Sequence, residues 1–184
     1  MLGTTHRSFT TAPVLALLAV SVLFAAGCGS SSDTKANEAY ANSVCSAIGS
    51  WEQQIKNLAT GLSGGISKAS LQMKVTQAES ATKTLATQIK AVPPPNTSDG
   101  QAAKQQVDQL STQVTSAVDS AKSAVASIPA NASATAIAVA LAPLASQVKS
   151  LASTAQATVT SLQTAKGSLA SAFKSTSSCK NLGG

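Results

Sequence analysis

The chain has 184 residues, with thirteen Lys and Arg against seven Asp and Glu, and only 3% of its residues are aromatic. Its single His and single Arg are His6 and Arg7, so the remainder carries no imidazole that could act as a base near neutral pH. The lysines are spread along the chain without interleaved aromatic residues, which argues against a nucleic-acid-binding surface. The length fits one domain.

The amino-terminal residues have the pattern of an export signal. Residues 1–11 are polar and include Arg7, and residues 12–26 then run without a charge. An apolar run of about 15 residues is shorter than the roughly 20 that a membrane-spanning helix needs. The pattern therefore favours a cleaved signal peptide over a retained transmembrane helix.

The residues that end this run indicate a lipid anchor. They read Leu23-Phe24-Ala25-Ala26-Gly27-Cys28, and glycine and serines follow. This resembles the lipobox of bacterial lipoprotein precursors, with Ala25 where Leu is usual. The resemblance implies cleavage between Gly27 and Cys28, and a diacylglyceryl group on the Cys28 thiol that holds the protein stably at a membrane. The alternative is an ordinary secreted protein in which Cys28 is a plain cysteine.

These features predict three parts of the chain. Residues 1–27 are a lipoprotein signal peptide, residues 28–34 are a lipidated flexible tether, and residues 35–184 form the body on the outer face of the cell membrane. The body is rich in Ala and has few Leu, Ile, Val and Phe. Because its net charge is low, we expect a thin helical core lined by alanine rather than disorder.

Two cysteines remain in the body, Cys45 and Cys179. An exported compartment permits a disulfide between them, which would close nearly the whole body. The alternatives are two free thiols, or a bond from one of them to another chain.

Four stretches show apolar residues at helical spacing. The first stripe is Tyr40, Val44, Ile48, Trp51, Ile55, Leu58 and Leu62. The second is Leu71, Val75, Ala78, Thr82, Leu85, Ile89 and Val92. The third is Ala103, Val107, Leu110, Val114, Ala117, Ala121, Ala124 and Ile128. The fourth is Ile137, Leu141, Leu144, Val148, Leu151, Ala155, Val159, Leu162, Leu169 and Phe173.

Short breaks at 61–65, 93–96 and 129–131 separate these stretches and favour antiparallel neighbours. We therefore predict an all-α, elongated, coiled-coil-like antiparallel bundle of about four helices, closed at one end by the disulfide. Ser98 and Gln101 have the spacing of a capping box that opens the third helix. Pro143 should either kink the fourth helix or mark its start.

Several side chains are expected to have structural roles. Trp51 is interpreted as a core anchor near the disulfide, with stacking on a ligand as the alternative. Tyr40 and Phe173 are expected to pack together beside the disulfide. Glu52 with Lys56, and Glu79 with Lys83, stand at the favourable four-residue spacing and predict ion pairs on a solvated face.

No catalytic residues, metal site or cofactor is expected. The body lacks His, and two cysteines are too few for a typical zinc site. Pairs of carboxylates on one helix, such as Asp108 and Asp119, are about 16 Å apart at 1.5 Å per residue, too far for paired general acid and base. We expect a non-enzymatic protein.

The segment 40–51, together with the carboxy-terminal cysteine, resembles the small Ala/Ser/Thr-rich lipoproteins and secreted proteins of high-G+C Gram-positive bacteria. The resemblance implies a helical, disulfide-closed envelope protein and no particular activity. We expect an interaction or spacer module that contacts an envelope protein or polymer. The alternative is a carrier of a small apolar or lipid ligand between the helices. Heptad seams could also pair between chains, so the oligomeric state stays open.

The lipid anchor predicts a specific mass. Protein isolated from membranes should begin at Cys28, carry acyl groups, and gain the mass of two hydrogens on reduction of the disulfide. Intact mass spectrometry with and without a reductant measures both. An unacylated Cys28 would contradict the anchor.

Overall fold

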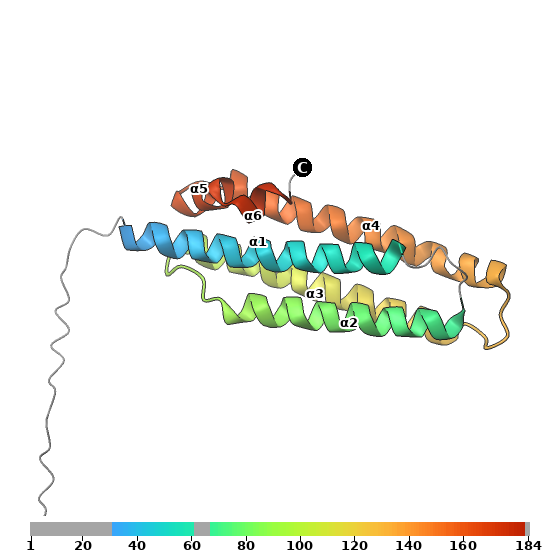
Figure 1. Ribbon diagram of the computed structural model, residues 1–184. Coiled ribbons are helices and arrows are strands. Elements are labelled where there is room, and N and C mark those ends of the chain that lie inside the picture. The colour runs from blue at the N-terminus through green and yellow to red at the C-terminus, as the bar shows by residue number, and fades with distance from the viewer. Residues whose placement is uncertain (1–30, 61–66, 183–184) are drawn as a thin grey trace, which may run out of the picture.

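The structure is a computed structural model that describes residues 31–60 and 67–182. Within these residues the chain forms helices and no strand: α1 (Ser31–Thr60), α2 (Lys68–Ala91), α3 (Ser98–Ser127), α4 (Ala134–Thr164), α5 (Ser168–Ser175) and α6 (Ser177–Lys180). The four long helices run side by side in an elongated bundle, and α5 and α6 fold back at one end (Figure 1). The predicted all-α antiparallel bundle is confirmed.

The predicted stripes form the core. Most stripe residues in α1, α2 and α3 are buried, and the larger core cluster extends from Tyr40 to Leu182. A smaller cluster of Leu71, Val125, Ile128 and Ile137 lies at the end of the bundle where α4 begins. Leu62 of the first stripe lies outside the described residues.

The predicted start of the third helix is one residue late. Thr97, not Ser98, is the N-cap, and its hydroxyl accepts a hydrogen bond from the Gly100 amide at 3.0 Å. Gly100 also lies so close to the preceding prolines that a Cβ there would be 2.1 Å from the Pro95 carbonyl oxygen. The triproline turn therefore packs tightly on the first turn of α3, which fixes where this helix begins.

The fourth predicted helix is two helices in the structure. α4 ends at Thr164, and Leu169 and Phe173 belong to α5. Gly167 between them has φ of +97°, a conformation that residues with a side chain rarely adopt, and it allows the chain to reverse. As a result α5 packs against both α1 and α4 instead of extending α4 beyond the bundle.

Pro143 lies inside α4 and does not start it. The helix begins at Ala134 after the N-cap Ser133, whose hydroxyl accepts a hydrogen bond from the Ala136 amide. Proline has no amide hydrogen and cannot donate to the carbonyl of Val139, which is 70% exposed. Residues 134–142 are therefore part of the long helix, anchored in the smaller core cluster by Ile137.

Cys45 and Cys179 meet where α6 crosses α1, with their sulfur atoms 2.02 Å apart and both side chains fully buried. Tyr40 and Phe173 pack edge to face beside them, with ring centroids 6.2 Å apart, as expected. Burial, and secondarily the charge of Asp108, raises the pKa of Tyr40 to about 12, so its phenol stays neutral.

Both predicted helical ion pairs form, and one of them extends between helices. The Glu79 carboxylate binds Lys83 at 2.9 Å within α2 and Lys122 of α3 at 2.8 Å. Hydrogen bonds from Lys122 and then Lys83 lower the pKa of Glu79 to about 2. The pair with Lys122 joins α2 to α3, a contact that spacing along one helix could not reveal.

Removing the disulfide should destabilise the fold strongly. The two cysteines are separated by 134 residues, and closing such a loop in the unfolded chain corresponds to about 4–5 kcal/mol in the chain-entropy estimate. The C45A/C179A variant should therefore unfold at a markedly lower urea concentration than the oxidised protein. A reductant should lower the midpoint of the natural protein to nearly the same value and leave the variant unchanged; equal midpoints before reduction would contradict the role of the bond.

Candidate functional site

The predicted site residues are Gly27, Cys28, Cys45 and Cys179. The structure joins Cys45 to Cys179 in a disulfide, whose role is structural. Gly27 and Cys28, the predicted cleavage and lipid-attachment residues, lie outside the described residues. α1 begins at Ser31, so residues 31–34 of the predicted tether are helical.

The candidate site is an apolar cavity of about 440 Å³ between the four long helices, in the half of the bundle away from the disulfide. We call it the distal cavity. Its apolar lining is Trp51, Ile55, Leu58, Ala59, Leu71, Val75, Ala78, Ala117, Val118, Ala121, Val125, Leu141, Leu144, Ala145, Val148 and Leu151. Lys74, Gln147 and Lys149 complete it. No residue of this set carries a negative charge.

The distal cavity follows from how α4 is supported. At the disulfide end, α5 and α6 pack against α1, and α5 also packs against α4. The direct contacts between α1 and α4 are few, so no helix fills the gap between them in the distal half. Small side chains in the lining, at Ala78, Ala117 and Ala121, fill little of this space.

Trp51 forms part of the inner wall of the distal cavity. It is 3% exposed, and its indole nitrogen donates a hydrogen bond to the Thr82 hydroxyl at 3.3 Å. The expectation of a core anchor is therefore correct in its burial, and the bond explains why a threonine interrupts the apolar stripe of α2. Because the indole N–H is already bound, this wall offers a ligand an apolar surface only.

The distal cavity reaches the surface along α4. Its exposed lining residues are Ala145, Gln147, Val148 and Lys149 on α4, and Ala59 at the end of α1. Among the described helices, α4 alone is long and apolar enough, by length and composition, to cross a membrane, yet only 6% of its apolar window is buried. One wall of the cavity is thus a helix with unusually apolar, exposed surface.

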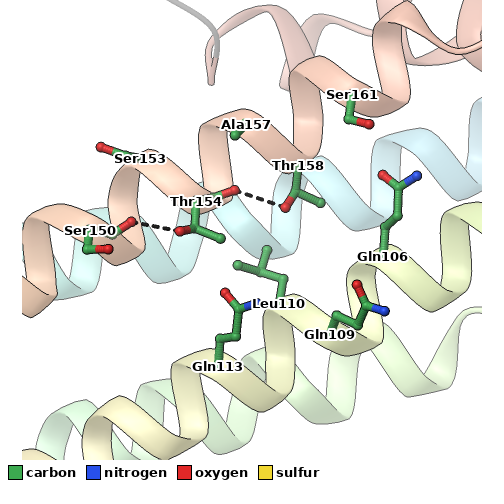
Figure 2. A pocket seen from close by; sticks show the side chains of 10 residues that line it. All are labelled: Gln106, Gln109, Leu110, Gln113, Ser150, Ser153, Thr154, Ala157, Thr158 and Ser161. Carbon is green, nitrogen blue, oxygen red and sulfur yellow. Dashed lines mark hydrogen bonds between the residues drawn. The ribbon is translucent and has the colours of Figure 1, made fainter.

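A second hollow, of about 510 Å³, lies between α3 and α4 and is polar. Figure 2 shows glutamines of α3 facing hydroxyl side chains of α4, with Leu110 between the two helices. Two of these hydroxyls, on Thr154 and Thr158, donate hydrogen bonds of 2.9 Å to backbone carbonyls of α4 itself. We call this hollow the α3–α4 groove.

Glu52 departs from the expected solvated face. It pairs with Lys56 at 3.7 Å as predicted, but it is 6% exposed, and its Oε1 atom has no hydrogen-bond partner among the described residues. Burial raises the pKa of Glu52, and the nearby Lys56 opposes this only in part. Helical spacing predicted the pair correctly, but it could not show that Glu52 would be buried in the folded bundle.

Nothing in the described ranges assembles metal-binding chemistry: they contain no group of three or more His, Cys, Asp or Glu side chains placed to hold an ion. The side chains around the distal cavity suit non-covalent binding, because they supply apolar surface and two ammonium groups but no nucleophile paired with a base.

No protein-family model, curated protein or solved structure matches the chain. The inference of function therefore depends on the geometry of the two hollows.

The buried carboxylate predicts a pH dependence of stability. Because burial raises the pKa of Glu52, the folded state binds the proton of this carboxyl group more tightly than the unfolded state does. The free energy of unfolding therefore falls as pH rises from 4.5, the usual pKa, through the higher pKa of the folded state. The E52Q variant should therefore gain stability relative to the natural protein between pH 4 and pH 7, measured by urea unfolding.

The E38Q variant is the matched control, because Glu38 lies on the same helix and is exposed. Its stability difference from the natural protein should change little with pH. If the difference for E52Q is equally constant, burial does not penalise the charged form of Glu52.

Proposed function

We propose that this protein is a lipid-anchored, extracytoplasmic carrier that binds a small apolar ligand or a lipid chain in the distal cavity, without catalysing a reaction. The observation that carries the proposal is the cavity itself, about 440 Å³ and lined almost wholly by apolar side chains. Ligand pockets commonly measure about 300–1,000 Å³ and are mostly apolar. Of the two functions expected from the sequence, this geometry favours the carrier over the spacer.

The arrangement of the lining supports reversible occupation. Four helices contribute to it, so an apolar ligand would be surrounded on several sides and would lose contact with water. Pro143 leaves one main-chain hydrogen bond of α4 unmade, directly before the lining residue Leu144. Bending of α4 at this residue would widen the gap from α1 without breaking further hydrogen bonds.

The position of the cavity suits a carrier that holds its ligand away from a membrane surface. Trp51 is twenty residues beyond Ser31, which is about 30 Å at 1.5 Å per residue. If Cys28 bears the lipid, the anchor precedes the start of α1 by three residues in the sequence. The part of α1 that lines the cavity, from Trp51 to Ala59, is at the other end of this helix. A ligand taken from the membrane could then be presented to another envelope component.

A second candidate function is the interaction or spacer module. The α3–α4 groove favours it, because its glutamine, serine and threonine side chains form a polar, uncharged surface suited to hydrogen bonding with an envelope protein or polymer. Two of its five hydroxyls, on Thr154 and Thr158, already donate to their own helix, so fewer donors are free for a partner than the residue count suggests.

The carrier function can be tested through the single tryptophan, Trp51, which lies in the cavity wall. An alkyl chain with a terminal bromine should quench its fluorescence on binding. In the A121F variant a phenyl ring would fill part of the cavity, so we expect the affinity for the chain to fall at least about tenfold while the fold is kept or stabilised.

The A102F variant is the matched control, because Ala102 lies on the same helix, is exposed and does not line the cavity. It should bind the chain as the natural protein does. If the natural protein shows no saturable quenching, or if both variants lose binding equally, the distal cavity is not a ligand site.

A further inference from the structure

We infer that the ligand of the distal cavity is an anionic amphiphile of the long-chain carboxylate type, with its alkyl chain against the apolar lining and its charged head held by Lys74 and Lys149. This inference rests on the proposed carrier function and specifies the class of ligand. It is drawn from the distribution of charge around the cavity.

The two lysines are the only charged residues of the lining, and they come from different walls, Lys74 from α2 and Lys149 from α4. Lys74 is partly buried and Lys149 is exposed. With two positive charges and no carboxylate along it, the lining attracts negative charge and disfavours a cationic head.

Neither lysine is paired with a carboxylate within residues 31–60 and 67–182. Four other lysines, 56, 83, 104 and 122, form ion pairs with carboxylates in the described part of the chain. Lys74 and Lys149 take part in no ion pair or hydrogen bond between described residues. An ammonium group beside an apolar cavity gains most from a ligand that brings its own negative charge.

The sequence places Lys149 at a boundary. Residues 123–148 carry no charge, so the part of α4 that forms the cavity wall is uncharged as far as Val148. Lys149 then stands next to Val148 at the exposed part of the lining. The lining thus changes from uncharged to positively charged at Lys149, as an amphiphile changes from its alkyl chain to its charged head.

The interior wall offers no competing polar position. The indole N–H of Trp51 is bound to Thr82, and the lining otherwise holds one uncharged polar side chain, Gln147, which is exposed. The head of a ligand therefore has partners only at the rim. A volume of about 440 Å³ is near the lower end of the usual range of about 300–1,000 Å³, which fits one alkyl chain better than the two chains of a phospholipid.

The test compares two probes with the same brominated alkyl chain length and different heads, the carboxylate of ω-bromododecanoic acid and the neutral hydroxyl of ω-bromododecanol. Binding to the lipid-free folded protein is followed by quenching of Trp51 fluorescence at pH 8, where the acid is ionised. We expect the acid to bind about tenfold more tightly than the alcohol, which corresponds to about 1.4 kcal/mol, and we expect the difference to shrink as salt is added.

In the K74Q/K149Q variant the preference for the acid should disappear while the alcohol binds as before. The matched control is K90Q/K166Q, which loses the same net charge at two exposed lysines outside the cavity and should keep the preference. Equal loss in both variants would assign the preference to the overall charge of the protein and overturn the inference.

The outcomes separate this inference from the proposed function. If the natural protein binds acid and alcohol equally, the cavity is a site for neutral apolar chains, so the carrier function stands and the anionic ligand does not. If neither probe quenches Trp51 saturably, both proposals fail. A dialkyl anionic phospholipid that displaces the acid at equal concentration would also overturn the assignment to single chains.

Discussion

The contact between Cys45 of α1 and Cys179 of α6 determines how the rest of the bundle is arranged. It holds the carboxy-terminal helices against α1, where Tyr40 and Phe173 add an aromatic contact. The chain reaches this position because Gly167 reverses it after α4. The result is a bundle with extra helices at one end and fewer at the other, and the open half is where the distal cavity lies.

The chain has few large apolar residues, and this scarcity explains both the distal cavity and the need for the disulfide. Alanine allows helices to approach closely but buries little area in each contact, so every helix contributes little hydrophobic free energy. In the distal half, the four long helices meet partly through alanine, and their side chains leave the remaining space unfilled. Glu52 and Asn37 are both buried with an oxygen that has no partner in the described part of the chain, which lowers the net stability of α1 further.

A binding protein can use such a marginal core. The lining of the distal cavity comes from the part of α1 beyond the disulfide and from α2, α3 and α4, which the disulfide does not directly hold. α4 also carries a proline within it. Local opening then costs less than unfolding the end of the bundle clamped by α5 and α6. Lys74 and Lys149, which form no ion pair among the described residues, add positive charge to a lining that is otherwise uncharged. Together these features support entry of an amphiphile from the side of α4.

The sequence by itself determined the helical class, the approximate helix positions, the cysteine pairing and the packing of Tyr40 on Phe173. Each depends on spacing along the chain or on counting cysteines, which needs no knowledge of neighbouring helices. It also predicted the export signal and Cys28 anchor, which lie outside the described residues and remain predictions.

Tertiary structure alone decided the break between α4 and α5, the N-cap at Thr97, the burial of Glu52 and the distal cavity. Leu162, Leu169 and Phe173 continue one helical spacing, so periodicity could not reveal that Gly167 adopts a positive φ. A cavity is a space left between four helices, and its size depends on how far α4 stands from α1. That separation is set by helices that fold back from the far end of the chain, and no local pattern in the sequence records it.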